Sequence, residues 1–168
     1  MGGASLLDWA PNYSKEKAKI TKNERFGSLY EQLFSKVDSL QAVQAVEPIA
    51  LLWMQGERDA RIPEAGEDYY PNFQQLINAF RNQLDNPILP IIAGLVNPPL
   101  DNYEALPIVQ KAQQQIAKED ANVYLIDTED LEKLEDNLHY NSTGQLELGK
   151  RYGVQLIDLL DKQDFKAR

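Results

Sequence analysis

Apolar residues recur along this chain in two alternating patterns, one typical of amphipathic helices and the other of buried strands. The helical spacing covers residues 26–37, 69–84, 106–118 and 142–160. Unbroken apolar runs cover residues 49–54, 88–96 and 123–127 and predict strands. Such alternation implies parallel strands joined by right-handed crossovers. We therefore expect an α/β fold, a three-layer α/β/α sandwich with a parallel sheet.

Polar residues mark where two of the helices should begin. Thr21 with Glu24, and Ser142 with Gln145, have the spacing of capping boxes. The last helix is expected to bury Leu146, Leu148, Tyr152, Leu156, Leu159 and Leu160. The length of 168 residues suits one domain, which we place at residues 1–160, followed by a charged tail at 161–168 that should fray.

Composition narrows the range of partners. The net charge of -9 and the pI of about 4.6 argue against nucleic acid and against an anionic membrane surface, whereas a neutral esterified sugar is compatible. With no cysteine, the chain has no disulfide, no thiolate nucleophile and no thiolate metal site. No signal peptide is visible at its N-terminus, and no segment is long enough to span a membrane.

The candidate chemistry lies in two short polar segments. The single histidine, His139, follows Asp136 by three residues, so that the carboxylate can hold one ring nitrogen while the other faces a cleft. Gln55 and Gly56 follow the apolar run at residues 49–54, at the predicted tip of a buried strand. Ligands of parallel sheets bind beyond such strand ends, so both segments are expected at one cleft.

Three ordered motifs carry a resemblance to a known family. They are Gly2-Gly3-Ala4-Ser5-Leu6 with Trp9, then Leu52-Trp53-Met54-Gln55-Gly56-Glu57-Arg58-Asp59-Ala60, then Asp136-Asn137-Leu138-His139-Tyr140 with Ser142, Gly144, Gln145 and Gly149. Together they resemble the sialate O-acetylesterases and acetylxylan esterases of the SGNH hydrolase superfamily, which are carbohydrate esterases of family six. The resemblance spans essentially the whole chain and implies a flavodoxin-like SGNH fold.

The resemblance also implies roles for individual positions. His139 would act as general base and then acid, and Asp136 would orient it. The oxyanion hole would contain Gln55 and either Gly3 or Gly2, as an amide side chain and a backbone N–H are fixed donors. Glu57 and Arg58 are substrate-cleft candidates, with Glu57 and Asp59 better interpreted as groups that order the loop. Arg58 stands where the family usually has a small serine. The resemblance implies no cofactor and no metal.

One motif of that family is missing from this sequence. The family nucleophile is a serine in a Gly-Gln-Ser-Asn-like motif after the first strand, upstream of everything present here. We therefore expect an N-terminally truncated domain that lacks its first strands and the catalytic serine. Residues 49–54 would then form an unpaired apolar strand edge through which copies of the chain can associate. A leader could have stood in the missing segment, so the compartment stays open.

Simpler interpretations remain for several residues. Ser142 fits a helix cap and Ser5 the oxyanion loop better than either fits a substitute nucleophile. The carboxylates near Asp127 and Asp136 are better explained as a solvated surface than as a metal site. Two classes of function stay open. One is an esterase that removes acetyl groups from sialic acid, xylan or related sugars, and the other is an inactive relic or non-enzymatic carbohydrate-binding domain.

Overall fold

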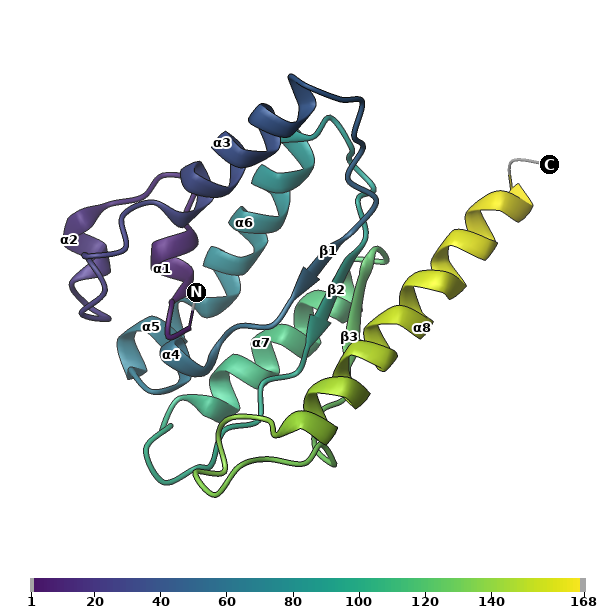
Figure 1. The fold of residues 1–168 in the computed structure, drawn as a ribbon. Helices are drawn as coiled ribbons and strands as arrows, with labels where there is room; N and C mark the ends of the chain where they lie inside the picture. Colours follow the sequence, from purple (N-terminus) through teal and green to yellow (C-terminus); the bar gives the residue numbers. More distant parts are fainter. Residues whose placement is uncertain (1, 167–168) are drawn as a thin grey trace.

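Three short parallel strands form the sheet in the computed structural model, which describes residues 2–166 and the side chains of residues 2–162 (Figure 1). The strands are β1 (Leu51–Trp53), β2 (Ile91–Gly94) and β3 (Val123–Ile126), in the order β1-β2-β3. Leu51 pairs with Ile91, which pairs in turn with Val123. The α/β class and the parallel sheet expected from the sequence are confirmed.

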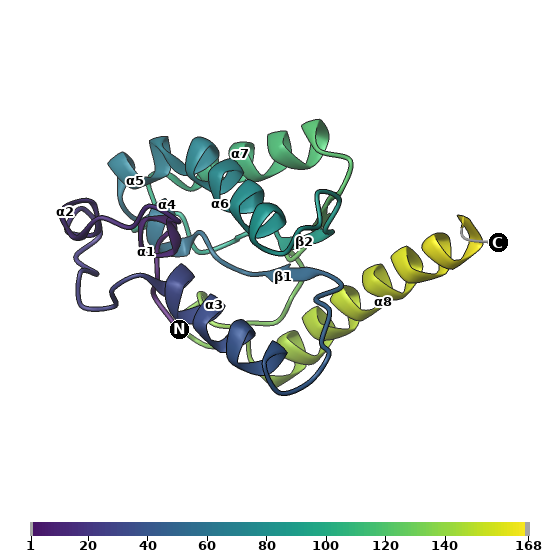
Figure 2. The ribbon, with the colours of Figure 1, turned by 90° about the horizontal axis from the view of Figure 1, so that it is seen from above.

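Helices cover both faces of this sheet. The long helices are α3 (Leu29–Gln41), α6 (Tyr69–Gln83), α7 (Leu106–Glu119) and α8 (Ser142–Lys166). The short helices are α1 (Leu6–Trp9), α2 (Lys15–Ala18), α4 (Glu57–Ala60) and α5 (Pro63–Glu67). Seen from above, α6 and α7 lie on one side of the sheet and α8 on the other (Figure 2). No helix of residues 2–166 is both long and apolar enough to cross a membrane.

The core divides along the same layers because successive side chains of a strand point to opposite faces. Ile91 belongs to the large cluster shared with α6 and α7, whereas its neighbour Ile92 packs with Tyr152 and Leu159 of α8. The large cluster also holds Phe34 of α3, whose ring lies 5.2 Å from that of Phe80 in α6. Central strand β2 is therefore buried on both faces.

Both predicted capping boxes are wrong. Ser28 caps α3, accepting a hydrogen bond from the Glu31 N–H, after Gly27 turns the chain with a positive φ of 65°. Thr21 is buried in a turn before this helix, where its hydroxyl bonds to the Ala18 carbonyl. Before α8, the Asn141 side chain accepts from the Gly144 N–H, so Asn141 and not Ser142 is the cap.

Several exposures also differ from the expected pattern. Leu146 was expected to be buried but is 77% exposed, whereas Tyr152 and Leu159 of the same expected set are buried against the sheet. β1 lies at one end of the three strands, and its Leu52 is 51% exposed, so the run at residues 49–54 is not covered on both faces. The helical backbone of α8 continues to Lys166, past the boundary expected at residue 160.

Candidate active site

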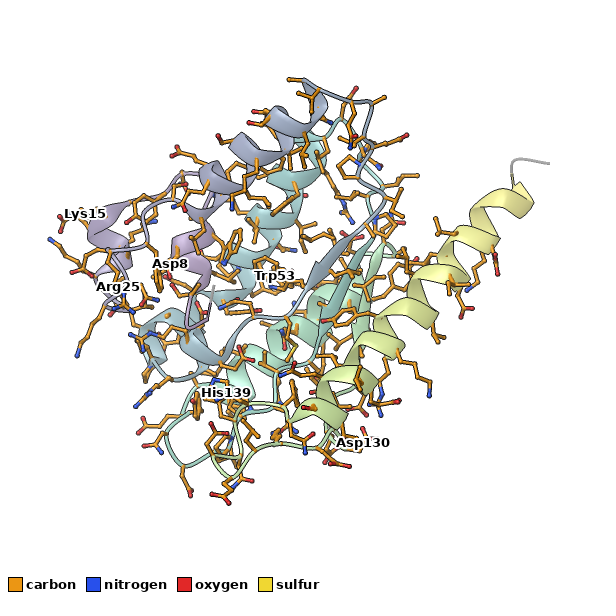
Figure 3. The ribbon with its side chains drawn as sticks, in the orientation of Figure 1. Asp8, Lys15, Arg25, Trp53, Asp130 and His139 are labelled. Carbon is orange, nitrogen blue, oxygen red and sulfur yellow. The ribbon has the colours of Figure 1, made fainter. Side chains whose placement is uncertain are left out.

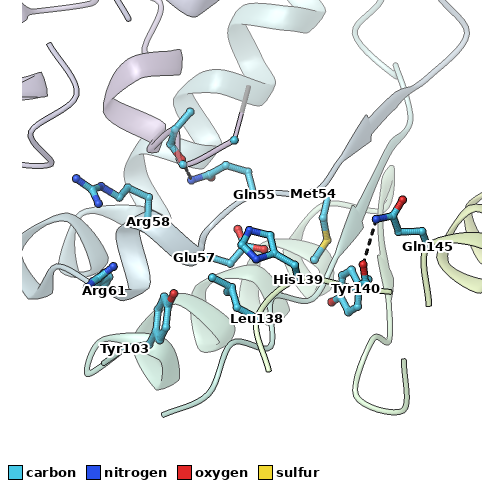
Figure 4. Close-up of a pocket in the computed structure, with 13 residues that line it drawn as sticks. Met54, Gln55, Glu57, Arg58, Arg61, Tyr103, Leu138, His139, Tyr140 and Gln145 are labelled. Carbon is cyan, nitrogen blue, oxygen red and sulfur yellow. Dashed lines mark hydrogen bonds between the residues drawn. The ribbon is translucent and has the colours of Figure 1, made fainter. Parts of the chain in front are cut away.

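A cavity of about 470 Å³ lies beyond the carboxyl end of β1, where ligands of parallel sheets are usually bound (Figure 4). Three segments that are far apart in the sequence meet there, together with Tyr103. The lining residues are Gly2, Gly3, Ala4, Met54, Gln55, Glu57, Arg58, Arg61, Tyr103, Leu138, His139, Tyr140 and Gln145. The structure thus brings together the cleft-facing residues of all three sequence motifs.

The acid and the histidine form a local pair on one wall. Asp136 Oδ2 lies 2.6 Å from His139 Nδ1, and Asp136 Oδ1 accepts hydrogen bonds from the N–H groups of Leu138 and His139. Between them, Asn137 has a positive φ of 53°, which closes the turn. The hydrogen bond from His139 holds the pKa of Asp136 down at about 2. Because Nδ1 is occupied, Nε2 is the ring nitrogen left for chemistry.

The backbone on either side of His139 is also held. The Leu134 N–H donates to the His139 carbonyl at 2.8 Å, and an isolated antiparallel bridge joins Lys133 to Tyr140. Gln145 donates to the Tyr140 carbonyl at 3.1 Å, which connects this loop to the first turn of α8 (Figure 4). His139, which is labelled in Figure 3, lies in the loop before α8. Its side chain is 69% exposed. The pair is therefore positioned by its own loop rather than by the core.

The opposite wall is built from the N-terminal loop and Gln55. Gln55 Nε2 donates to the Ala4 carbonyl at 3.0 Å and to Asp59 Oδ2 at 2.5 Å. Both of its amide hydrogens are thus used within the protein, and its buried Oε1 accepts no hydrogen bond from the described residues. Gly3 has a positive φ of 76°, a conformation that favours glycine.

Asp59 anchors this wall from behind. The carboxylate is fully buried and also accepts from the Leu6 N–H, at 3.1 and 3.2 Å to its two oxygens. Burial raises its pKa to about 7, against the opposing effect of the hydrogen bonds from Gln55 and Leu6. Burial also raises the pKa of Asp8, a second enclosed carboxylate.

The two cleft candidates differ in how far they face the cavity. Glu57 is half-buried, and burial raises its pKa, while the charges of His139 and Lys133 act the other way. The Arg58 guanidinium points away from Glu57 and His139 (Figure 4). Its Nε donates to the Thr21 carbonyl at 3.0 Å, so Arg58 ties α4 to the N-terminal region and forms no ion pair with the described residues.

The position after Gln55 requires a glycine, Gly56, because of its backbone conformation and its close neighbours. Its φ is 145°, and a Cβ there would lie 3.1 Å from methyl groups of both Val96 and Val109. A side chain at this position would push α4 away from β2 and α7. The glycine therefore permits the close approach that keeps Gln55 and Glu57 at the cavity.

Sequence reasoning missed the support beneath Gln55. Gln113 of α7 is buried, and its Nε2 donates to the Gln55 carbonyl, the Gly94 carbonyl and the Tyr69 hydroxyl at 3.2–3.3 Å. Tyr69 donates to the same Gln55 carbonyl at 2.9 Å. A signal was present, because Gln113 is the polar residue on a helix face otherwise made by Val109, Ala112 and Ile116.

None of the residues that line the cavity is a serine, threonine or cysteine. Ser5 is fully buried and its hydroxyl donates to Asp8, while Ser142 is exposed at the start of α8 and is not part of the lining. Among residues 2–166, no group of three or more histidine, cysteine, aspartate or glutamate side chains could hold a metal ion. The lining thus includes the histidine of the His139–Asp136 pair but no serine, threonine or cysteine from this part of the chain.

Comparison with known proteins places the whole architecture in one family. Residues 1–158 match the sequence profile of the carbohydrate esterases described as sialic acid-specific acetylesterases. A probable carbohydrate esterase of Arabidopsis thaliana is 28% identical over 148 residues, which is 88% of this chain and 49% of the relative. The chain therefore spans about half the length of this relative.

Solved structures support the same fold. The X-ray structure of a protein from Arabidopsis thaliana is similar with a TM-score of 0.73 and 26% identity, covering 94% of this chain and 58% of that one. A carbohydrate esterase of family 3 from Talaromyces cellulolyticus has a TM-score of 0.62 over 95% of this chain and 70% of that one. At 19% identity, the second likeness bears on the fold alone.

Proposed function

Since the chain belongs to the sialic acid-specific acetylesterase family of carbohydrate esterases, we propose that its cavity is the histidine–aspartate part of a serine esterase site. The substrate would be an O-acetylated carbohydrate such as an acetylated sialic acid or xylan. The observation that carries the proposal is the 2.6 Å contact between Asp136 and His139, since His139 lines a cavity together with Gly2, Gly3 and Gln55. These are the groups that acyl transfer requires, apart from the nucleophile.

The nucleophile is proposed to come from a further segment in the active form of the protein. In that form a serine attacks the acetyl carbonyl, His139 Nε2 takes its proton, and Asp136 keeps the imidazole in the required tautomer. The negative charge of the tetrahedral intermediate would face the backbone N–H groups of the N-terminal loop, which Gln55 holds at the Ala4 carbonyl. Support comes from the cavity lining, which has no hydroxyl nucleophile of this kind, and from the length of the Arabidopsis relative.

The open edge of β1 is the proposed position of that segment. β1 is an edge strand of the sheet that the described residues form, and the side chain of its Leu52 is half-exposed. An added parallel strand at this edge would end close to Gln55, since the carboxyl ends of parallel strands share one edge of the sheet. Without such a strand, the same edge is proposed to pair two copies of the chain. Size-exclusion chromatography with light scattering tests this, and a stable monomer at high micromolar concentration would contradict it.

The function is tested by measuring acetate release from an aryl acetate and from an acetylated sugar. Two proteins are compared, namely this chain alone and the chain extended upstream by the nucleophile-bearing segment of the family. We expect turnover only from the extended protein, with nearly complete loss in His139→Ala and no change in Glu135→Gln. Glu135 is a matched control because it is an exposed acid in the same loop.

Three outcomes would contradict the proposal. Turnover by the chain alone would mean that it already contains a nucleophile. Indifference of the extended protein to His139→Ala would remove the histidine from the mechanism. Binding of acetylated sugar without turnover by the extended protein would favour a non-enzymatic carbohydrate-binding domain.

A further inference from the structure

Two buried carboxylates lie behind the N-terminal wall of the cavity, and neither forms an ion pair with the described residues. Asp8 and Asp59 are both completely buried. Each accepts a hydrogen bond from a carboxamide, Asp8 from Asn23 Nδ2 at 2.9 Å and Asp59 from Gln55 Nε2 at 2.5 Å. An isolated buried carboxylate is costly, so the arrangement requires a reason beyond packing.

The same two carboxamides hold successive carbonyl groups of the N-terminal loop. Asn23 Nδ2 donates its other hydrogen to the Gly3 carbonyl at 2.9 Å, and Gln55 Nε2 donates its other hydrogen to the Ala4 carbonyl at 3.0 Å. The loop is thus gripped by two equivalent units, each made of a carboxylate, a carboxamide and a backbone carbonyl. The units come from different parts of the chain, because Asn23 precedes α3 and Gln55 follows β1.

The carboxylate determines which end of each carboxamide faces the loop. A carboxylate only accepts hydrogen bonds, so it turns the NH₂ group toward itself, and the second hydrogen is left for the carbonyl. An alanine in its place would remove this acceptor, so nothing would fix which end of the carboxamide faces the loop. The carboxamide could then rotate and release the loop carbonyl.

Holding the carbonyls also orients the N–H groups of the loop. In a planar trans peptide the C=O and the following N–H point in opposite directions, and no described peptide is cis. The inward Gly3 carbonyl therefore turns the Ala4 N–H outward. Neither the Gly3 nor the Ala4 N–H donates to another described residue, although both residues line the cavity.

We propose that Asp8 and Asp59 are positioning residues that hold the Ala4 N–H toward the cavity, because through Asn23 and Gln55 they fix the Gly3–Ala4 peptide and the Ala4–Ser5 peptide that follows it. The inference rests on the proposed function, in which this loop faces the oxyanion. It assigns the Ala4 N–H as an oxyanion donor beside Gly3, and it gives Gln55 a role through the loop, as both amide hydrogens of Gln55 are already in use.

The test uses this chain as it is, labelled with ¹⁵N at glycine and alanine. In the parent chain we expect Gly3 and Ala4 to be rigid, with backbone order parameters of about 0.85. Their amide hydrogens should nevertheless exchange quickly with solvent. In Asp8→Ala and Asp59→Ala the order parameters should fall below about 0.6, while glycines of the sheet such as Gly94 stay rigid. Asp127→Ala, which removes an exposed carboxylate that bonds only to the Glu129 N–H, should change nothing.

Unchanged order at Gly3 and Ala4 in both folded variants would overturn the inference. If the variants do not fold, the parent chain alone still tests the inference. Low order parameters at Gly3 and Ala4, or slow solvent exchange of the Ala4 N–H, would contradict it. In the extended esterase, Asp59→Ala should lower kcat by about 10²–10³ with KM nearly unchanged. Since loop order is measured without catalysis, an inactive extended protein would contradict the proposed function and leave this inference standing.

Discussion

The two walls of the cavity are built in opposite ways. The Asp136–His139 pair is local, exposed and closed by bonds between residues two or three apart. The Gly2–Ala4 wall is buried from behind and depends on contacts between residues 20 to 53 positions apart, as in Asn23 with Gly3 and Leu6 with Asp59. The comparison shows that a surface turn is enough to position a proton-transferring histidine. The backbone N–H donors of the N-terminal loop, in contrast, are positioned by residues of the folded core.

The largest expected effect concerns the local wall. In the extended protein, Asp136→Asn should lower kcat by about 10³–10⁴, because an amide favours the wrong imidazole tautomer. In the present chain the same substitution should change the free energy of unfolding by less than about 0.5 kcal/mol, since the site is exposed. Acetate release and urea unfolding measure the two effects. A loss of stability comparable to that of a core substitution would break the comparison.

The buried wall should respond in stability first. Asp59→Ala leaves the Leu6 N–H and one hydrogen of Gln55 without an acceptor, so we expect a loss of roughly 2–5 kcal/mol in the free energy of unfolding. Chemical denaturation of the parent and variant chains checks this value. Asp130→Ala, which removes an exposed ion pair with Arg151, is the control and should cost less than about 1 kcal/mol. Similar costs for the two variants would show that the network is not important for folding.

The two walls should also titrate in opposite directions. The pKa of Asp59 is raised to about 7 by burial, and that of Asp136 is lowered to about 2 by the His139 hydrogen bond. A raised pKa means that the folded state holds the proton more tightly, so the Asp59 contribution is most favourable below pH 4 and is lost as the pH rises to 7. The Asp136 contribution is present above pH 4 and is lost as the pH falls toward 2.

These titrations can be followed by ¹³C NMR of the side-chain carboxyl groups. The groups that face Asp59 are Asp8 from α1 and Tyr69 from α6, besides its uncharged partners Gln55 and Leu6. Between pH 4 and 7 the free energy of unfolding should fall by up to about 1.4 kcal/mol per pH unit for each buried carboxylate that titrates. Asp59→Asn should reduce this slope. An unchanged slope would mean that Asp59 does not titrate in that range.

The same contrast explains what the sequence could reveal. Helices α6 and α7 were predicted nearly to the residue, because their apolar positions repeat at helical spacing and Pro71 and Pro107 lie in their first turns. Helices α1, α2, α4 and α5 were not predicted, since four or five residues are too few to show a period. Their positions depend on contacts made elsewhere in the fold.

The candidate site divides in the same way. The Asp136–His139 spacing and the placement of Gln55 after a strand are local features. His139 and Gln55 line the cavity, and Asp136 contacts His139 from outside the lining. Asn23 and Gln113 could not be assigned because their partners lie 15 to 58 positions away. The roles proposed for Gln55, Gly3 and Gly2 remain predictions that depend on catalysis by the complete site.

The smallest expected effect comes from two glycines of the N-terminal loop, which separate the cost of an unfavourable backbone conformation from the cost of a steric clash. An added Cβ would meet nothing within 4 Å at either Gly2 or Gly3, but only Gly3 has a positive φ, at 76°. Gly3→Ala should therefore cost about 1–2 kcal/mol through backbone strain alone, whereas Gly2→Ala should be neutral or slightly stabilising. Urea unfolding of both variants gives the difference directly. Because Asn23, which is held by Asp8, binds the Gly3 carbonyl, Asp8→Ala should shrink the Gly3→Ala penalty in a double-mutant cycle. Strictly additive effects would show that the buried carboxylate does not constrain this loop.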